Sequence, residues 1–261
     1  MMFHFYNLYI EFFEGMVMSD KAELFAQLDE YGYVVWERAL TADQVGVLKE
    51  RSIELAKKER ELGAQLYLDN KSQRVWNLVN KGKVFAEMIQ HPSVLEFQEY
   101  LLGKNCTLSS FTVNLIGSGS PSAGLHIDYP LSILPTPHPS FALCANSIYL
   151  LDDFSLENGA TCLVPGSHKR GYGPSSGETY NDIIQVTGKK GDIIIVHGHI
   201  WHGSGENRTD QDRVALLGFF CRSFMKPQQD HLRLIAPEII EGASATLKRL
   251  LGVDSQPSLN D

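Results

Sequence analysis

Apolar positions recur at helical spacing in the first hundred residues of the chain. Ser19 and Thr41 are residue types favoured at helix N-caps, and each precedes a run in which apolar side chains return every three or four positions. Gly32 follows the first run and predicts its end. The elements predicted here are helices over 20–30, 42–62, 84–90 and 94–102, and a short strand over 33–36.

The pattern changes after Gly103. Short β-branched and aromatic runs now alternate with turns rich in glycine, proline and serine, which is typical of a sandwich or barrel. A proline-rich loop over 129–139 interrupts them, and helical spacing returns over 237–251. The predicted strands cover 106–115, 147–151, 161–164, 193–196 and 214–222. We therefore expect one domain over 19–252, preceded by an N-terminal extension (1–18) and followed by a polar tail (253–261).

Composition and charge narrow the range of partners. Apolar residues make up 43% of the chain and charged residues 21%, as in ordinary globular proteins. The 23 basic residues against 31 acidic ones give a net charge of −8, so neither nucleic acid nor an anionic membrane surface is an expected partner. The four cysteines are far apart and form no CxxC pair, which indicates reduced thiols and a cytoplasmic protein.

Two short segments carry candidate metal ligands. His126 and Asp128 are separated by one residue, so on a strand both would point to the same face. An apolar strand further along the chain runs into a turn with three histidines, His197, His199 and His202, any of which could supply a third ligand. Two imidazoles and one carboxylate on one face form the facial triad of non-haem Fe(II) oxygenases.

Arg213 opens a strand whose other residues on the same face are apolar. A buried arginine there would need an anionic partner, and its guanidinium fork matches a carboxylate. The small neighbour Ala215 would leave room for such a ligand. A surface arginine at the start of a strand is the alternative, and spacing alone does not decide between the two.

Five segments, in this order and at these separations, resemble the phytanoyl-CoA dioxygenase family of Fe(II)- and 2-oxoglutarate-dependent oxygenases. The resemblance implies a mainly β fold with flanking helices, the double-stranded β-helix or cupin-like jelly roll. It also implies Fe(II), 2-oxoglutarate and dioxygen as the reactants besides substrate. The segments are DEYGYVVWERALTADQVGVLKE, GLHIDYP, LLDDFSLENGATCLVPGSH, GDIIIVHGHIWHGSGENRTDQDR and CRSFMKPQQ.

The resemblance also assigns roles to individual residues. It implies that His126, Asp128 and His202 bind iron, since the distal ligand of the family directly precedes a Gly-x-Gly-x-Asn stretch. It implies that Arg213 and Thr161 bind 2-oxoglutarate. Residues 120–124 lack the glutamine that several relatives use for the same purpose. Position suggests a contact of Asn114 to cosubstrate or substrate. It also suggests four substrate contacts: Tyr129, His138, Trp201 and Arg222.

The expected activity is oxidation, chiefly hydroxylation, of an unactivated carbon of a small molecule, with release of succinate and carbon dioxide. A carboxylate at Asp128 disfavours halogenation, because iron halogenases of this fold carry a small residue there. Two alternatives remain open: a zinc or manganese cupin-like isomerase or hydrolase, and a non-catalytic ligand-binding barrel. The sequence is compatible with a monomer or a homodimer.

Overall fold

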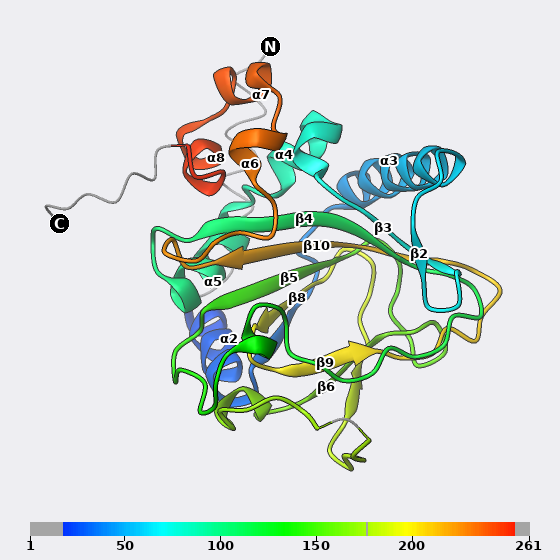
Figure 1. The fold of residues 1–261 in the computed structure, drawn as a ribbon, viewed down its shortest axis with the longest axis vertical. Coiled ribbons are helices and arrows are strands. Elements are labelled where there is room, and N and C mark those ends of the chain that lie inside the picture. The colour runs from blue at the N-terminus through cyan, green and yellow to red at the C-terminus, as the bar shows by residue number, and fades with distance from the viewer. Residues whose placement is uncertain (1–17, 176, 254–261) are drawn as a thin grey trace, which may run out of the picture.

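Two antiparallel β-sheets face each other, and helices cover the outer face of the larger one (Figure 1). The computed structural model describes residues 18–175 and 177–253. The large sheet has seven strands in the order β1-β8-β5-β10-β4-β3-β2, and the small sheet has three in the order β7-β6-β9. This arrangement confirms the predicted mainly β class of double-stranded β-helix with flanking helices. The expected extension (1–18) and tail (253–261) lie almost entirely outside the described residues.

All six predicted strands are present in the structure, which adds four more. The predicted strands are found as β1 (Tyr33–Trp36), β4 (Thr107–Ile116), β5 (Cys144–Leu150), β6 (Thr161–Val164), β8 (Ile193–His197) and β10 (Arg213–Cys221). The additional strands are β2 (Leu66–Tyr67), β3 (Ser72–Val75), β7 (Ile184–Val186) and β9 (Trp201–Ser204).

The helices agree with the sequence where local signals are strong. Thr41 caps α3 in a capping box with Gln44, as the N-cap signal predicts. The helix α2 already includes Ser19, so this residue is not its N-cap. The α-helices are α2 (Met18–Tyr31), α3 (Ala42–Glu61), α4 (Lys83–Met88), α5 (Pro92–Leu102), α6 (His231–Leu234), α7 (Pro237–Glu241) and α8 (Ala245–Leu250). Short 3-10 turns lie at Leu78–Lys81, Leu131–Ile133 and Ser167–Lys169.

The single closing helix predicted over 237–251 is wrong, because the structure breaks it in two. Gly242 follows α7, and the Ser244 side chain accepts a hydrogen bond from the backbone of Leu247 to start α8. Gly242 ends the first helix and the N-cap Ser244 starts the second, even though the apolar spacing continues across the break.

The two faces of the large sheet have different roles. Its outer face packs against α2, α3, α5 and α8 in one continuous apolar core. Its inner face meets the small sheet through a second apolar cluster that includes Ile148, Leu163 and Ala215. Because directly paired residues on neighbouring strands share a face, the pairing of Ala215 with Asn114 and with Leu150 places all three side chains on the inner face. The candidate chemistry lies on this inner face and on the strands opposite.

Among the described residues, no helix has both the length and the apolar character needed to cross a bilayer.

Candidate active site

Two of the candidate ligands are held together by the backbone. His126 and His202 exchange both main-chain hydrogen bonds, each 2.9 Å from nitrogen to oxygen, so the segment around His126 pairs with the edge of β9. The pairing at His126 is an isolated bridge rather than the regular strand that the sequence analysis assumed. It still brings together residues 76 positions apart in the chain, and their ring centroids lie 4.5 Å from each other.

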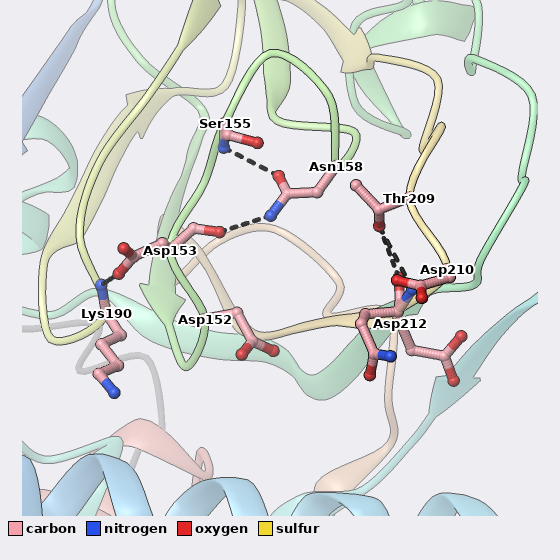
Figure 2. A pocket seen from close by; sticks show the side chains of 9 residues that line it. Asp152, Asp153, Ser155, Asn158, Lys190, Thr209, Asp210 and Asp212 are labelled. Carbon is pink, nitrogen blue, oxygen red and sulfur yellow. Dashed lines mark hydrogen bonds between the residues drawn. The ribbon is translucent and has the colours of Figure 1, made fainter.

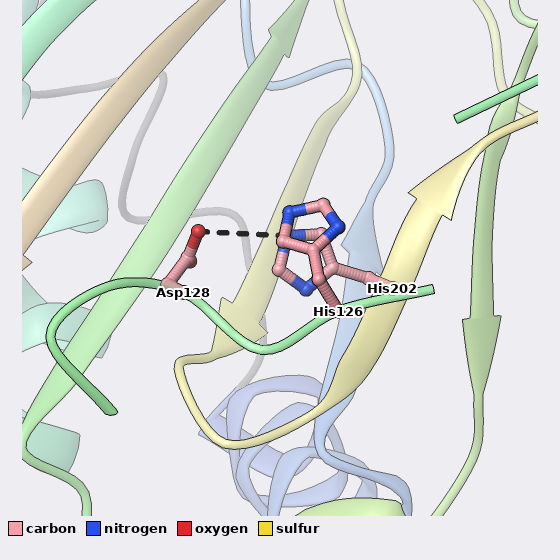
Figure 3. A group of neighbouring side chains, drawn as sticks. All are labelled: His126, Asp128 and His202. Atoms are coloured by element: carbon pink, nitrogen blue, oxygen red, sulfur yellow. Dashed lines mark ion pairs between the residues drawn. The ribbon is translucent and has the colours of Figure 1, made fainter. Parts of the chain in front are cut away.

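Asp128 completes a compact group with the two histidines (Figure 3). One ligand atom from each of the three side chains lies within 4.8 Å of the other two, and Asp128 Oδ1 is 3.7 Å from His202 Nε2. Two imidazole nitrogens and one carboxylate oxygen suit a divalent first-row metal and leave positions open for other ligands. The other two histidines of the turn, His197 and His199, are not part of this group.

The orientation of both rings favours metal binding through Nε2. Nδ1 of His126 donates to Gly124 O and Nδ1 of His202 donates to Ile200 O, each at 3.1 Å. A histidine whose second nitrogen is engaged in this way has a fixed tautomer and presents a lone pair on Nε2. Burial, and then the charge of His202, lower the pKa of His126, which favours the neutral form that a metal requires.

Gly203 allows the ligand segment to approach β9. A Cβ at this position would lie 2.7 Å from the carbonyl oxygen of Ala123 and 3.0 Å from that of Gly124. Both atoms belong to the backbone that leads into His126, so a side chain at Gly203 would force the ligand segment away.

Arg213 lies on the inner face, and its guanidinium is almost completely buried. It donates one hydrogen bond from Nη2 to Gly159 O (2.8 Å) and stacks on Phe154 with 4.0 Å between Cζ and the ring centroid. Nε is buried and has no partner among the described residues. Burial lowers the pKa of Arg213 to about 10, while the charges of Tyr67 and Asp152 act in the opposite direction. An anionic ligand would satisfy both the charge and the unpaired donor.

A polar group near Arg213 includes residues that the sequence analysis missed. Tyr67 of β2 donates a hydrogen bond to Asn114 Oδ1, and Arg74 Nη2 of β3 is 3.4 Å from the same oxygen. The Arg74 guanidinium also lies over the ring of Trp76, at 5.8 Å from its centroid. Arg74 pairs directly with Asn114, so it shares the inner face, and its charge makes a minor contribution to the lowered pKa of His126.

Two hydroxyl groups lie opposite each other on the small sheet. Thr161 of β6 pairs with Ser204 of β9, and the neighbouring pair on the same face is Leu163 with His202. Ser204 Oγ is buried and has no hydrogen-bond partner among the described residues. The sequence analysis predicted Thr161 but missed Ser204, although its position two residues after His202 on a strand implies a shared face.

The four predicted substrate contacts have different environments. Tyr129 follows Asp128 and is 58% exposed, so its side chain is available to a ligand. His138 is buried next to His199, and Trp201 is buried with its indole nitrogen donating to Tyr172 O. Arg222 donates to the main-chain carbonyl groups of Ala142 and Leu101 and stacks on Phe141. The structure therefore does not bring these four side chains together, and their role as substrate contacts stays a prediction.

An acidic groove is lined in part by residues 209–212, which directly precede Arg213 (Figure 2). Its aspartates include Asp152, which accepts a hydrogen bond from Val214 N and pairs with Lys49. Asp153 accepts from Lys190 N and pairs with Lys189, and the first of these hydrogen bonds is the main cause of its lowered pKa. These carboxylates are engaged with the surrounding protein, so the groove supports the backbone near Arg213 rather than forming a second metal site.

Comparison with known proteins gives a consistent result. The family model described as phytanoyl-CoA dioxygenase (PhyH) matches residues 28–215. "Dioxygenase af480" of Aspergillus fumigatus is 31% identical over 182 residues, which are 69% of this chain and 58% of that protein. "Dioxygenase FUM3" of Gibberella moniliformis is 25% identical over 258 residues, or 90% of this chain and 83% of that protein. The chain thus spans about 60% of the length of the first curated relatives that it matches.

Solved structures share the fold. HygX from Streptomyces hygroscopicus, with nickel, 2-oxoglutarate and hygromycin B bound, superposes with a TM-score of 0.62 at 18% identity. The match covers 78% of this chain and 88% of HygX. At this level of identity the likeness concerns the fold and not the ligands.

Proposed function

The chain belongs to the phytanoyl-CoA dioxygenase family, and from this premise we propose that it is an Fe(II)- and 2-oxoglutarate-dependent dioxygenase that hydroxylates an unactivated carbon of a small molecule. The products would be the oxidised substrate, succinate and carbon dioxide. The observation that carries the proposal is the combination, on facing sheets, of a two-histidine, one-carboxylate group and a buried arginine whose Nε is unpaired.

The metal would be held by His126, Asp128 and His202, whose donor types suit Fe(II). When bound, iron and 2-oxoglutarate together supply the dioxygen chemistry that oxidises the substrate. The protein would supply orientation: the carbonyl groups of Gly124 and Ile200 engage Nδ1 of both imidazole rings, which leaves Nε2 of each for the metal.

The cosubstrate would be gripped at its far carboxylate by Arg213. This carboxylate would satisfy the buried Nε and neutralise a charge that burial disfavours. Thr161 and Ser204 would add hydroxyl donors from the small sheet. Arg74 and Asn114 pair directly on the inner face of the large sheet, and Arg74 is our candidate for the cosubstrate contact that the missing glutamine makes in relatives.

Hydroxylation requires that bulk water be kept from the metal, and the apolar surroundings of His202 support this role. Leu163 pairs directly with His202 and packs with Ile148 and Ala215 between the sheets, so the protein next to this ligand is apolar. HygX binds nickel, 2-oxoglutarate and hygromycin B, which supports a metal, an oxoacid and a small molecule as ligands of this fold.

An anaerobic titration of metal-free protein tests the proposal. We expect a weak visible charge-transfer band that requires both Fe(II) and 2-oxoglutarate, followed by succinate release when air is admitted. The band should be absent in His202→Ala and retained in His168→Gln, a matched histidine variant outside the metal group. Tight binding of zinc or manganese without such a band would favour a cupin-like isomerase or hydrolase. Absence of metal binding would favour a ligand-binding barrel.

A further inference from the structure

The inner face of the large sheet carries one amide that the proposed function does not use. Asn146 of β5 pairs with Phe219 of β10 and with Val196 of β8, and Phe219 pairs with Ser110 of β4. Side chains at directly paired positions share a face, so these residues form a row across the inner face. We call Ser110, Phe219 and Asn146 the polar row, after the two polar residues that flank Phe219.

The polar row lies near the segment that bears two of the metal ligands. Phe219 belongs to the same apolar cluster as Cys144 and Ile127. Cys144 is two residues before Asn146 on the same strand and face, and Ile127 lies between His126 and Asp128. Through this cluster, the strand ends that carry the polar row pack against the segment that bears two of the metal ligands.

Asn146 has an unmet hydrogen-bonding requirement. Its Oδ1 is buried and has no partner among the described residues. The nearest polar member of the row is already engaged, because Ser110 Oγ donates to Gln228 Oε1 at 2.8 Å. Leaving an amide oxygen buried and unpaired is unfavourable, so native proteins keep such a group where a ligand or water completes it.

The carboxylate of the cosubstrate that Arg213 would hold does not supply the missing hydrogen bond to Asn146 Oδ1. Phe219 is six residues beyond Arg213 on β10, a separation of about 20 Å along a strand. This is well beyond the length of a five-carbon diacid held at Arg213. The carboxylate held at Arg213 therefore does not reach Asn146, and we assign this amide to the substrate, or to a group that the substrate replaces.

We propose that Asn146 recognises a hydroxyl group on an otherwise apolar substrate, an inference that rests on the proposed function. The flanking side chains on its face, Cys144 and Ile148, are apolar and buried, which favours a hydrocarbon skeleton. A hydroxyl group both donates and accepts, so it satisfies either orientation of the amide. A carboxylate would fit only the orientation that turns the amide nitrogen toward it, and the buried apolar neighbours disfavour its charge.

Two fluorinated probes test the proposal without knowledge of the substrate. 4-Fluorobenzyl alcohol and 4-fluorotoluene share a skeleton and differ in the hydroxyl group. Each is titrated anaerobically into protein loaded with Fe(II) and 2-oxoglutarate, and binding is followed by ¹⁹F line broadening. We expect the wild type to bind the alcohol about five-fold more tightly, the effect of one net hydrogen bond. Asn146→Leu, which conserves side-chain volume, should bind both probes equally.

The controls separate the possible failures. Ile148→Leu alters the shape of the same face without altering its polarity, so it should change the affinity for both probes by the same factor. Asn146→Leu should melt at the same temperature as the wild type or higher, because the amide oxygen it removes is unpaired. A wild type without preference for the alcohol, or a preference that persists in Asn146→Leu, overturns the inference. The charge-transfer band of the same samples reports the iron site, so its absence would count against the proposed function alone.

Discussion

Replacing Arg213 by methionine should separate stability from cosubstrate binding. Methionine fills much of the same space but carries neither the charge nor the donors. In the wild type the guanidinium is buried, donates once to Gly159 O and keeps Nε unpaired. It is therefore a buried cation whose anionic partner would be supplied by the bound ligand.

The structure indicates the size of both effects. Burial lowers the pKa of Arg213 to about 10, which corresponds to about 3 kcal/mol of unfavourable free energy at neutral pH. Methionine removes this penalty but leaves Gly159 O unpaired, which costs about 1–2 kcal/mol. We therefore expect the ligand-free variant to be more stable than the wild type by about 1 kcal/mol, a rise of about 2–4 °C in melting temperature. Its affinity for 2-oxoglutarate should fall by at least about 30-fold, as for the loss of one partner of a buried charge pair.

The assay combines urea unfolding of metal-free protein with an anaerobic 2-oxoglutarate titration of the Fe(II)-loaded protein. Arg170→Met is the matched control, since Arg170 pairs with Asp182 and stacks on Trp201 outside the candidate cosubstrate site. It should leave the affinity for 2-oxoglutarate unchanged. An Arg213→Met variant that loses stability but keeps its affinity for 2-oxoglutarate would refute the reasoning and make Arg213 a structural residue.

Acid should destabilise the protein at pH values well above those at which carboxylates titrate. Burial lowers the pKa of His197 to about 2 and of His199 to about 4, so both rings stay neutral in the fold while they protonate near 6.5 in the unfolded chain. The contribution of the two neutral rings to the free energy of unfolding is complete above pH 6.5. It is lost as the pH falls, at about 1.4 kcal/mol per pH unit for each ring. Urea unfolding at pH 7 and pH 5 measures this slope, which His199→Leu should reduce. Gly203→Ala places a Cβ 2.7 Å from Ala123 O and should weaken Mn(II) binding by about 10–100-fold with an unchanged circular dichroism spectrum; equal Mn(II) affinity would contradict the role given to Gly203.

Local signals in the sequence predicted much of the fold. The helix α3 was predicted because Thr41 and Gln44 form a cap within one turn. The strand β3 was missed because its side chains, including Ser72 and Gln73, are polar yet buried. Its place in the sheet depends on pairing with β4, about forty residues away, and no local pattern encodes such pairing.

In the candidate site, too, local sequence signals predicted some residues, whereas residues that depend on the pairing of distant strands were missed. His126 and Asp128 could be predicted as neighbours because one residue separates them, and the resemblance selected His202 among three histidines. Arg74 and Tyr67 could not be predicted, because they reach Asn114 only through the register of strands that the sequence did not reveal. Asn146 has no motif at all, and its significance arises from an oxygen that the completed fold leaves unpaired.

The division of the site between the two sheets has a mechanical consequence. His202 stands on the small sheet, whereas Arg213 stands on the large one. A ligand that joins the metal group to Arg213 therefore fastens the two layers of the sandwich to each other. Opening of the layers would break that link, so occupancy should slow amide hydrogen exchange in β6 and β9 together with β10. If the proposed function holds, a small diacid would act as a removable crosslink between the sheets, and amide exchange would report whether it is bound.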